Sequence, residues 1–411
     1  MKEFIAVGNS ERDFDFIEKY YSDTAGVRVQ LRNIIDRDFV SLIPDGVSVW
    51  IDPGVDALSR VEDNNLADKW KDFFKKFKNG EDLIENIKHG KITKKGKAKD
   101  FAQSIINACN EYDPEWISTP QLPLRVDSET NRNKLNRDLA EGTGEWLMEE
   151  NNHSKLMLPM IFDNQDILNM QGDRSEVIRI LNQLLDRLQP DGIWVVNSDL
   201  NDEEAWSKHN QKRLPGLISF HSRLKQEFEN PDLTFVAGPY WAMNLILWAR
   251  QLIDLPLISI GTGYQYYRSG GEYLRRPADR ICVPTLRRRV RHSPELKKWL
   301  EDSIAKLNKS DLSDSQVTGI GERLDQAAKE LSDLKKNFDM LEGDVGHEQV
   351  ARCYKEWYDD IHEINPSMRA LYMRQNFSSA DVIGRILSPL PEKNKTQDPS
   401  KLARQYMLNC F

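Results

Sequence analysis

Eight polar side chains stand at or shortly after the ends of apolar runs of the kind that form buried strands. The expected catalytic residues are Asp52, Asp163 and Asp199, and the expected ligand-binding residues are Asn9, Gln121, Asn197, Tyr240 and Tyr264. Carboxylates supported by amides and aromatic rings suit glycosidic chemistry, in which one carboxylate stabilises an oxocarbenium-like centre and another handles the proton. Any single Asp at such a place can instead be a helix N-cap, so the prediction depends on the joint pattern.

A repeated order of apolar run, polar terminus and amphipathic helix predicts the elements that position these residues. The densest apolar part, residues 233–271, holds the runs Thr234 to Ala237 and Leu257 to Ile260 with a helical pattern between them, which is one βαβ unit. Seven or eight such runs follow one another from Phe4 onward. We therefore predict an α/β fold, a (β/α)8-type barrel over residues 1–293, whose strand ends converge on one ligand site. A doubly wound open sheet is the alternative, although the GxGxxG fingerprint is absent.

Three segments depart from this rhythm. Residues 62–112 form a Lys-rich insertion, whose aromatic spacing predicts an amphipathic helix and whose Lys-Gly run predicts an exposed loop. This insertion is interpreted either as a contact with nucleic acid or another anionic ligand, or as a solvated helical surface with a flexible tip. Residues 294–411 are charged and helical, and we predict a C-terminal extension that could bind a protein partner. Val27 to Leu31 alternates apolar with polar residues, which predicts a half-exposed strand.

Arginines cluster directly after the predicted ligand end of the last strand. The expected nucleic-acid-binding residues are Arg275, Arg276, Arg287, Arg288 and Arg289. Arginine forks fit phosphate oxygens, so a nucleic-acid backbone or a nucleotide phosphate is the predicted ligand. Since the formal net charge is -8, ion pairs with acidic residues of the chain itself are the alternative.

The composition, 39% hydrophobic and 30% charged, is that of a soluble globular protein. We predict a cytoplasmic location without a membrane partner, because no signal-peptide pattern and no apolar segment of about 18 residues is present. The four cysteines are isolated and are expected to be buried free thiols. HExxH, GxSxG and GxxxxGKS motifs are absent, so we expect no metal and no cofactor.

The order of strand ends resembles that of the tRNA-guanine transglycosylase superfamily, barrels that exchange guanine for a 7-deazaguanine at an N-glycosidic bond, in some members within DNA. The turn Asp52, Pro53, Gly54 is similar in position to the Asp-Ser-Gly-Gly turn that supplies a general acid/base in that family. The family's nucleophilic aspartate would fall near Ser259 to Gly261 and its base-reading aspartate near Thr119 to Gln121, where this chain has no carboxylate. Its Cys-rich zinc motif is also absent. The resemblance covers the order of elements over residues 1–290 and implies a barrel with a nucleobase or nucleotide ligand.

Two functions stay open from the sequence. The first is a transglycosylase-like enzyme, a glycosyltransferase acting on a nucleobase N-glycosidic bond in nucleic acid or nucleotide, with Asp52 as the leading catalytic group. The second is a catalytically degenerate barrel that serves as a nucleic-acid-binding or assembly subunit of a multi-protein complex. The polar strand ends favour the first function, and the missing family carboxylates favour the second.

Overall fold

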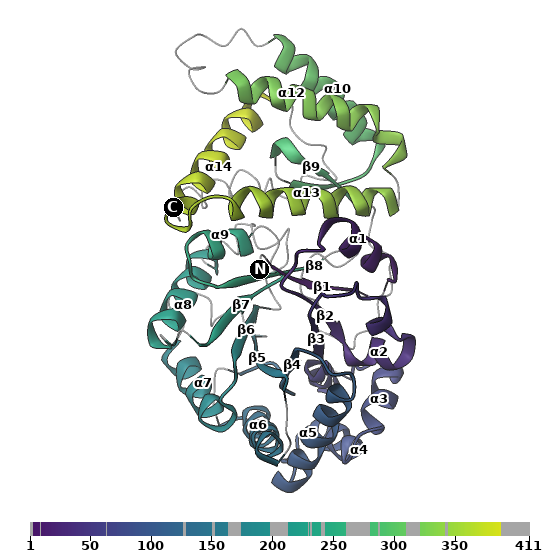
Figure 1. Ribbon diagram of the computed structural model, residues 1–411, viewed down its shortest axis with the longest axis vertical. Helices are drawn as coiled ribbons and strands as arrows, with labels where there is room; N and C mark the ends of the chain where they lie inside the picture. The colour runs from purple at the N-terminus through teal and green to yellow at the C-terminus, as the bar shows by residue number, and fades with distance from the viewer. Residues whose placement is uncertain are drawn as a thin grey trace. The chain divides into compact units, whose positions relative to one another are not determined.

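Eight parallel strands close into a barrel in which β1 pairs with β8 and every other neighbour follows in chain order (Figure 1). The computed structural model describes residues 3–8, 10–62, 64–125, 129–149, 153–162, 174–197, 213–228, 230, 232–239, 243–259, 280–286, 288–309, 321–341 and 344–387. The pairing of β1 with β8 confirms the predicted (β/α)8-type barrel and rules out the open sheet.

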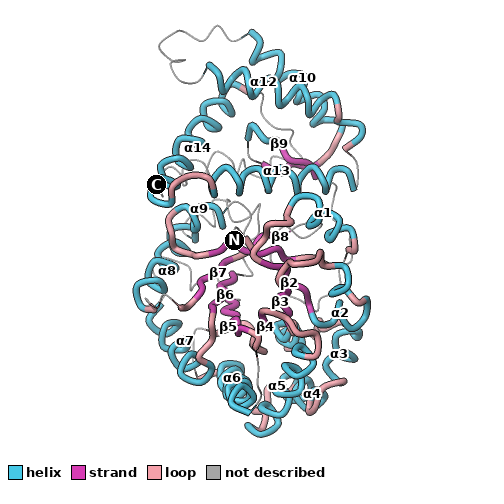
Figure 2. The backbone as a smooth tube through the Cα atoms, viewed as in Figure 1, coloured by secondary structure: helices cyan, strands magenta, loops and turns pink. Residues whose placement is uncertain are grey.

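The strands lie inside a ring of helices (Figure 2). The strands are β1 Phe4–Ala6, β2 Gly26–Gln30, β3 Val49–Asp52, β4 Trp116–Ser118, β5 Lys155–Phe162, β6 Gly192–Asn197, β7 Thr234–Ala237 and β8 Leu255–Ser259. The helices of this unit are α1 Arg12–Tyr20, α2 Leu31–Arg37, α3 Asp68–Lys75, α4 Gly80–Lys88, α5 Lys95–Asn110, α6 Asn131–Glu149, α7 Arg174–Leu188, α8 Arg213–Glu227 and α9 Met243–Ala249, with 3-10 turns η1 Phe39–Leu42 and η2 Val55–Val61.

Large aromatic side chains from β1, β3, β4 and β6 fill the barrel interior. Phe4 contacts Trp50 and Trp116 edge to face, at ring distances of 5.1 and 6.0 Å, and Trp50 contacts Trp194 at 5.4 Å. Edge-to-face pairs of this kind are favourable beyond the area that they bury. A barrel interior is a packed core rather than a pore, so these rings form a rigid floor beneath the carboxyl ends of the strands.

The prediction of a half-exposed strand at Val27 to Leu31 is wrong. Strand β2 is covered on both faces, with Val27 and Val29 fully buried and Arg28 only 7% exposed. The alternating pattern has another cause here: one face of β2 packs beneath the helices, while the other carries a charged side chain into the barrel. The charge of Arg28 therefore needs a partner inside the fold.

The Lys-rich insertion is more structured than the predicted single helix with an exposed loop. It forms α3, α4 and α5, and Phe73 and Phe74 of α3 are buried. Phe74 and Phe77 both contact Phe101 of α5, at 6.3 Å. The turn between α3 and α4 places Asn79 at a φ of 63°, which breaks the helix. The aromatic residues therefore form a small core, and the first helices of the insertion are part of the fold.

The described residues from Arg280 onward form a second compact unit. It contains the antiparallel pair β9 Arg280–Val283 and β10 Arg288–Arg291, the helices α10 Pro294–Lys309, α12 Gly321–Lys336, α13 Asp344–His362 and α14 Arg369–Ile386, and the 3-10 turns η5 Pro284–Leu286, η6 Phe338–Met340 and η7 Pro366–Met368. The expected boundary after residue 293 differs from this division. Ile281, Val283 and Val290 pack in one core with Leu296 and Trp299, so the hairpin belongs with the helices that follow it.

Candidate active site at the carboxyl end of the barrel

A buried ion pair joins β2 and β3 inside the barrel. Asp52 is the last residue of β3 and is 4% exposed, and a terminal nitrogen (Nη2) of Arg28 donates to its Oδ2. The other carboxylate oxygen, Oδ1, accepts a hydrogen bond of 3.0 Å from the backbone N–H of Gly54. Removing two charges from water costs several kcal/mol per ion, which such a pair recovers only with good geometry and further hydrogen bonds. An interaction this costly at the ligand end of a barrel is a candidate functional site.

The guanidinium of Arg28 lies against an aromatic wall. Its central carbon is 4.3 Å from the ring centre of Trp194, a cation–π geometry. The indole N–H of Trp194 donates to the carbonyl of Gly238 at 2.7 Å, and that of Trp50 donates to Ser118 Oγ at 2.8 Å, so both rings are fixed. Arg28 Nε is buried and has no hydrogen-bond partner in the part of the chain that the structure describes. This N–H is thus a donor held in place within the site.

The turn that follows Asp52 is braced by the insertion. Gly54 has a φ of 67°, in the left-handed region that favours glycine, and a Cβ there would lie 2.9 Å from the Trp70 indole of α3. The guanidinium of Arg32 from α2 lies 5.2 Å from the centre of the same ring. The N–H of Gly54 points at Asp52 because this turn is fixed, so the insertion contributes to the geometry of the carboxylate.

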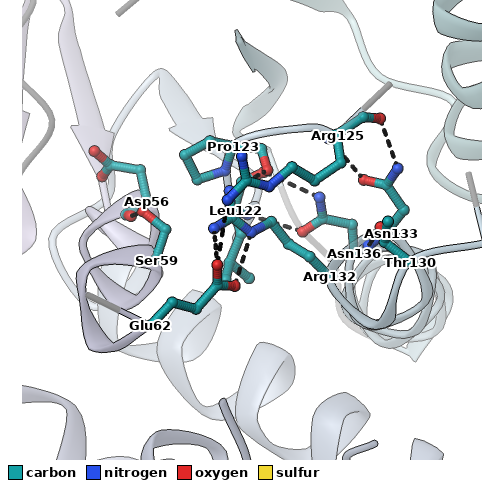
Figure 3. Close-up of polar contacts among 10 residues, drawn as sticks. All are labelled: Asp56, Ser59, Glu62, Leu122, Pro123, Arg125, Thr130, Arg132, Asn133 and Asn136. Carbon is teal, nitrogen blue, oxygen red and sulfur yellow. Dashed lines mark hydrogen bonds and ion pairs between the residues drawn. The ribbon is translucent and has the colours of Figure 1, made fainter. Parts of the chain in front are cut away.

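Side-chain amides of α6 hold the loop that follows β4 (Figure 3). Asn136 accepts from the N–H of Leu122 at 2.8 Å and donates to its carbonyl at 2.9 Å. Asn133 does the same for Arg125, at 3.2 and 2.8 Å. Each side-chain amide pairs with the N–H and the C=O of one loop residue, as the backbone of a neighbouring strand would. These hydrogen bonds satisfy backbone groups that would otherwise lack partners.

An ion pair connects this loop with the one after β3. Arg132 of α6 donates from Nε to Glu62 Oε1 at 3.0 Å and from Nη2 to Glu62 Oε2 at 2.5 Å, and it also reaches the carbonyl of Pro123 at 3.3 Å (Figure 3). Such a two-point contact fixes orientation as well as distance. Two loops at the carboxyl end of the barrel are therefore tied to each other next to the strand that carries Asp52.

Gln121 lies in the loop after β4 and is buried. Its Nε2 donates to the carbonyl of Asn136 at 3.3 Å, which directs the side chain toward α6. Its Oε1 has no hydrogen-bond partner among the described residues. The structure thus gives Gln121 a contact with a helix, and its role toward a ligand stays a prediction.

A second carboxylate lies where β1 meets α1. Asp13 is 2% exposed, and burial raises the pKa of its carboxyl to about 7, while a hydrogen bond of 2.7 Å from the Gly8 N–H acts in the lowering direction. Asn33 of α2 donates to the Gly8 carbonyl at 3.3 Å, which holds this loop. A carboxyl with a pKa near neutrality, at the same end of the barrel as Asp52, is suited to general acid/base work.

Most of the other predicted site residues lie outside the described residues. These are Asn9, Asp163, Asp199, Tyr240, Tyr264, Arg275, Arg276 and Arg287. Asn197 ends β6, and Arg288 and Arg289 belong to β10, but the description does not extend to their side chains. The predicted convergence of the three aspartates stays a prediction. Arg28 and Asp13 were not predicted; the signal for Arg28 was a polar residue within a strand of a fully covered sheet.

The described residues contain no group of three or more His, Cys, Asp and Glu side chains that could hold a metal ion. Burial lowers the pKa of His221 in α8 to about 3, so its ring is neutral. Cys109, Cys282 and Cys353 are buried free thiols, as predicted. Within the same described ranges, no helix has the length and apolar character that crossing a membrane requires.

Comparison of the chain with protein-family models gave no match, and no curated protein is significantly similar to it in sequence.

We expect Arg28→Met to lower the free energy of unfolding by about 3–5 kcal/mol, since it leaves the Asp52 charge buried without its partner. Denaturant unfolding measures this loss. Arg179→Met is the control: its ion pair with Glu176 on α7 is 48% exposed at Arg179, and such pairs contribute at most about 1 kcal/mol. Equal losses in the two variants would contradict the assignment of a buried charge pair.

The raised pKa of Asp13 predicts a pH-dependent contribution to stability. The native state keeps a proton on this carboxyl that the unfolded state releases from about pH 4 upward, so the contribution is full below about pH 4 and is lost as the pH rises through about 7. The stability of the wild type relative to Asp13→Asn should therefore fall by up to about 4 kcal/mol over this range. Denaturant unfolding at a series of pH values tests it, with the exposed Asp15→Asn as the control. Parallel pH profiles of wild type and Asp13→Asn would refute the prediction.

Proposed function

We propose that this chain is a transglycosylase-like enzyme that acts on a nucleobase N-glycosidic bond in nucleic acid or a nucleotide. The observation that carries the proposal is the Arg28–Asp52 pair, buried at the carboxyl end of a closed parallel barrel and backed by Trp194. Asp52 also begins the turn that resembles the acid/base turn of the tRNA-guanine transglycosylase superfamily. Both the chemistry of the pair and this resemblance support the proposal.

Cleavage of an N-glycosidic bond develops positive charge on the sugar and negative charge on the departing base. Arg28 Nε is a fixed donor that suits the negative charge on the base, because preorganised donors stabilise a developing charge without reorganisation. Asp52 orients this guanidinium and is the proposed proton-handling carboxylate. Asp163 and Asp199 are the proposed carboxylates for the sugar centre. The planar base would be bound by aromatic and amide side chains of the same end, for which Asn9, Gln121, Asn197, Tyr240 and Tyr264 are proposed.

The proposed phosphate contacts are the arginines of the segment after the barrel: Arg275, Arg276, Arg287, Arg288 and Arg289. Their guanidinium groups match phosphate oxygens in geometry and charge. A nucleotide or nucleic-acid substrate, rather than a free base alone, is the ligand class that this arrangement favours.

A second candidate function has one specific observation in its favour. Both carboxylate oxygens of Asp52 are already occupied, by Arg28 and by the Gly54 N–H, as they would be in a pair with a purely structural role. The chain would then be a catalytically degenerate barrel that binds nucleic acid or assembles with other proteins, the C-terminal helices being the proposed protein contact. Catalysis by Asp52 distinguishes the two functions.

Base exchange tests the proposed enzyme directly. The protein is incubated with DNA or RNA and radiolabelled guanine, and incorporation of label into the polymer is measured. We expect incorporation by the wild type and a loss of about 100-fold or more in Asp52→Asn, the usual effect of removing a general acid/base.

Glu115→Gln provides the matched control, because Glu115 directly precedes β4, at the opposite end of the barrel, and should leave exchange unchanged. Exchange that persists in Asp52→Asn would reject Asp52 as catalytic, and the absence of exchange in the wild type would favour the degenerate barrel.

A further inference from the structure

Most lysines of the insertion fall into two groups. Those of the first group are held by acidic residues: Lys71 by Asp68, Lys75 by Glu81, Lys78 by Asp100, Lys97 by Asp82, and Lys95 and Lys99 by Glu141. Lys88, Lys91 and Lys94 are exposed and form no ion pair with any described residue. All three belong to one short stretch, residues 88–94, which runs from the last residue of α4 to the residue before α5 and is called the tip below. Uncompensated positive charge in the insertion is therefore concentrated at the tip, although Lys76, the residue directly after α3, is also exposed and without an ion pair to any described residue.

The tip is attached at the same end of the barrel as Asp52. Asn131, the first residue of α6, donates from Nδ2 to the carbonyl of Gly90 at 2.9 Å. Because α6 follows β4, its first residue lies at the carboxyl end of that strand. Thr93 is buried while the neighbouring Ile92 is 64% exposed, so the tip is anchored by one side chain and open to solvent at the next. The three lysines thus lie at the same end of the barrel as the candidate site.

Arg125 adds a further positive charge at this end of the barrel. Glu62 is bound by the buried Arg132 through two hydrogen bonds, which leaves Arg125, 3.3 Å from Glu62, as the second cation on a single carboxylate (Figure 3). The side chain of Arg125 is 41% exposed. We call Lys88, Lys91, Lys94 and Arg125 the basic rim.

We infer that the basic rim binds the phosphodiester backbone of a nucleic acid. The three lysines form no ion pair with any described residue and Arg125 shares the single carboxylate of Glu62 with Arg132, so the rim has positive charge left over for phosphates. Each phosphate contact releases counterions from the polymer. The side chains offer point charges and one planar fork rather than a base-reading surface, so binding depends on the backbone and is independent of sequence. This inference rests on the proposed function in one respect, the direction of the bound strand toward the Asp52 site, and it makes the substrate a polynucleotide.

The dependence of binding on salt tests the basic rim. Fluorescence anisotropy measures the affinity of the full chain for labelled DNA and RNA oligonucleotides over a range of salt concentrations. Lys88→Gln, Lys91→Gln and Lys94→Gln combined should weaken binding and lower the slope of log affinity against log salt by about two to three, because each phosphate contact contributes roughly 0.7–0.9.

The matched control removes three compensated lysines from the same insertion. Lys71→Gln, Lys75→Gln and Lys78→Gln combined change the net charge equally, and this variant should keep a slope within about one of the wild type. Equal loss of slope in the two triple variants would overturn the inference, since it would reduce the effect to net charge. Absence of salt-dependent binding in the wild type would overturn it as well. Tighter binding of DNA than of RNA, or the reverse, identifies the polymer.

Failure of the basic rim can be told from failure of the proposed function. Asp52→Asn should bind nucleic acid with the wild-type slope and exchange no base, while the tip variant should lose binding and keep exchange into a free nucleoside. Rim-dependent binding without any base exchange supports the rim and rejects the enzyme. If base exchange occurs and the tip variant has the same salt slope as the wild type, the enzyme is supported and the rim is rejected.

Discussion

One buried ion pair sets the requirements that the rest of the barrel meets. A guanidinium and a carboxylate inside a closed sheet have lost their hydration, and the pair persists because Arg28 lies on Trp194 and Asp52 receives the Gly54 N–H. The aromatic floor fixes the first contact, and Trp70 against the Gly54 turn fixes the second. Parts of the chain that are far apart in sequence thus converge on one charged contact.

The loops above the barrel extend the same principle to its rim. The contacts of Asn133 and Asn136 with the loop after β4, and of Arg132 with Glu62, replace water around backbone and charged groups by fixed partners. Anchored loops on a rigid scaffold are where binding residues are usually carried. Lys88, Lys91 and Lys94 also stand on an anchored segment. By contrast, lysines such as Lys71 of α3 and Lys97 of α5 are ion-paired.

Much of the barrel could be predicted from the sequence because its strands are short apolar runs with polar ends, and Asp52 could be selected on that pattern. The alternation in Val27 to Leu31 has two physical meanings, a half-exposed strand or a charge inside a barrel, and only closure of the sheet decides between them. In the sequence, Asp13 is an acidic residue in the first turn of a helix, a common place for an exposed carboxylate. Its burial could not be predicted, because burial depends on how distant parts of the chain pack around it. The predicted boundary after residue 293 separates the β9–β10 hairpin from the helices with which it shares a core, because the apolar residues that connect them are distant in sequence.

We propose that the Arg28–Asp52 pair is kept for chemistry and not for stability. The most direct measurement is the free energy of unfolding, together with base exchange, of the double variant Arg28→Met with Asp52→Leu. Replacing a buried ion pair by apolar residues of similar volume is often neutral or stabilising by about 1–4 kcal/mol. The double variant should therefore be at least as stable as the wild type and should exchange no base. A loss of several kcal/mol in stability, or exchange at the wild-type rate, would contradict the claim.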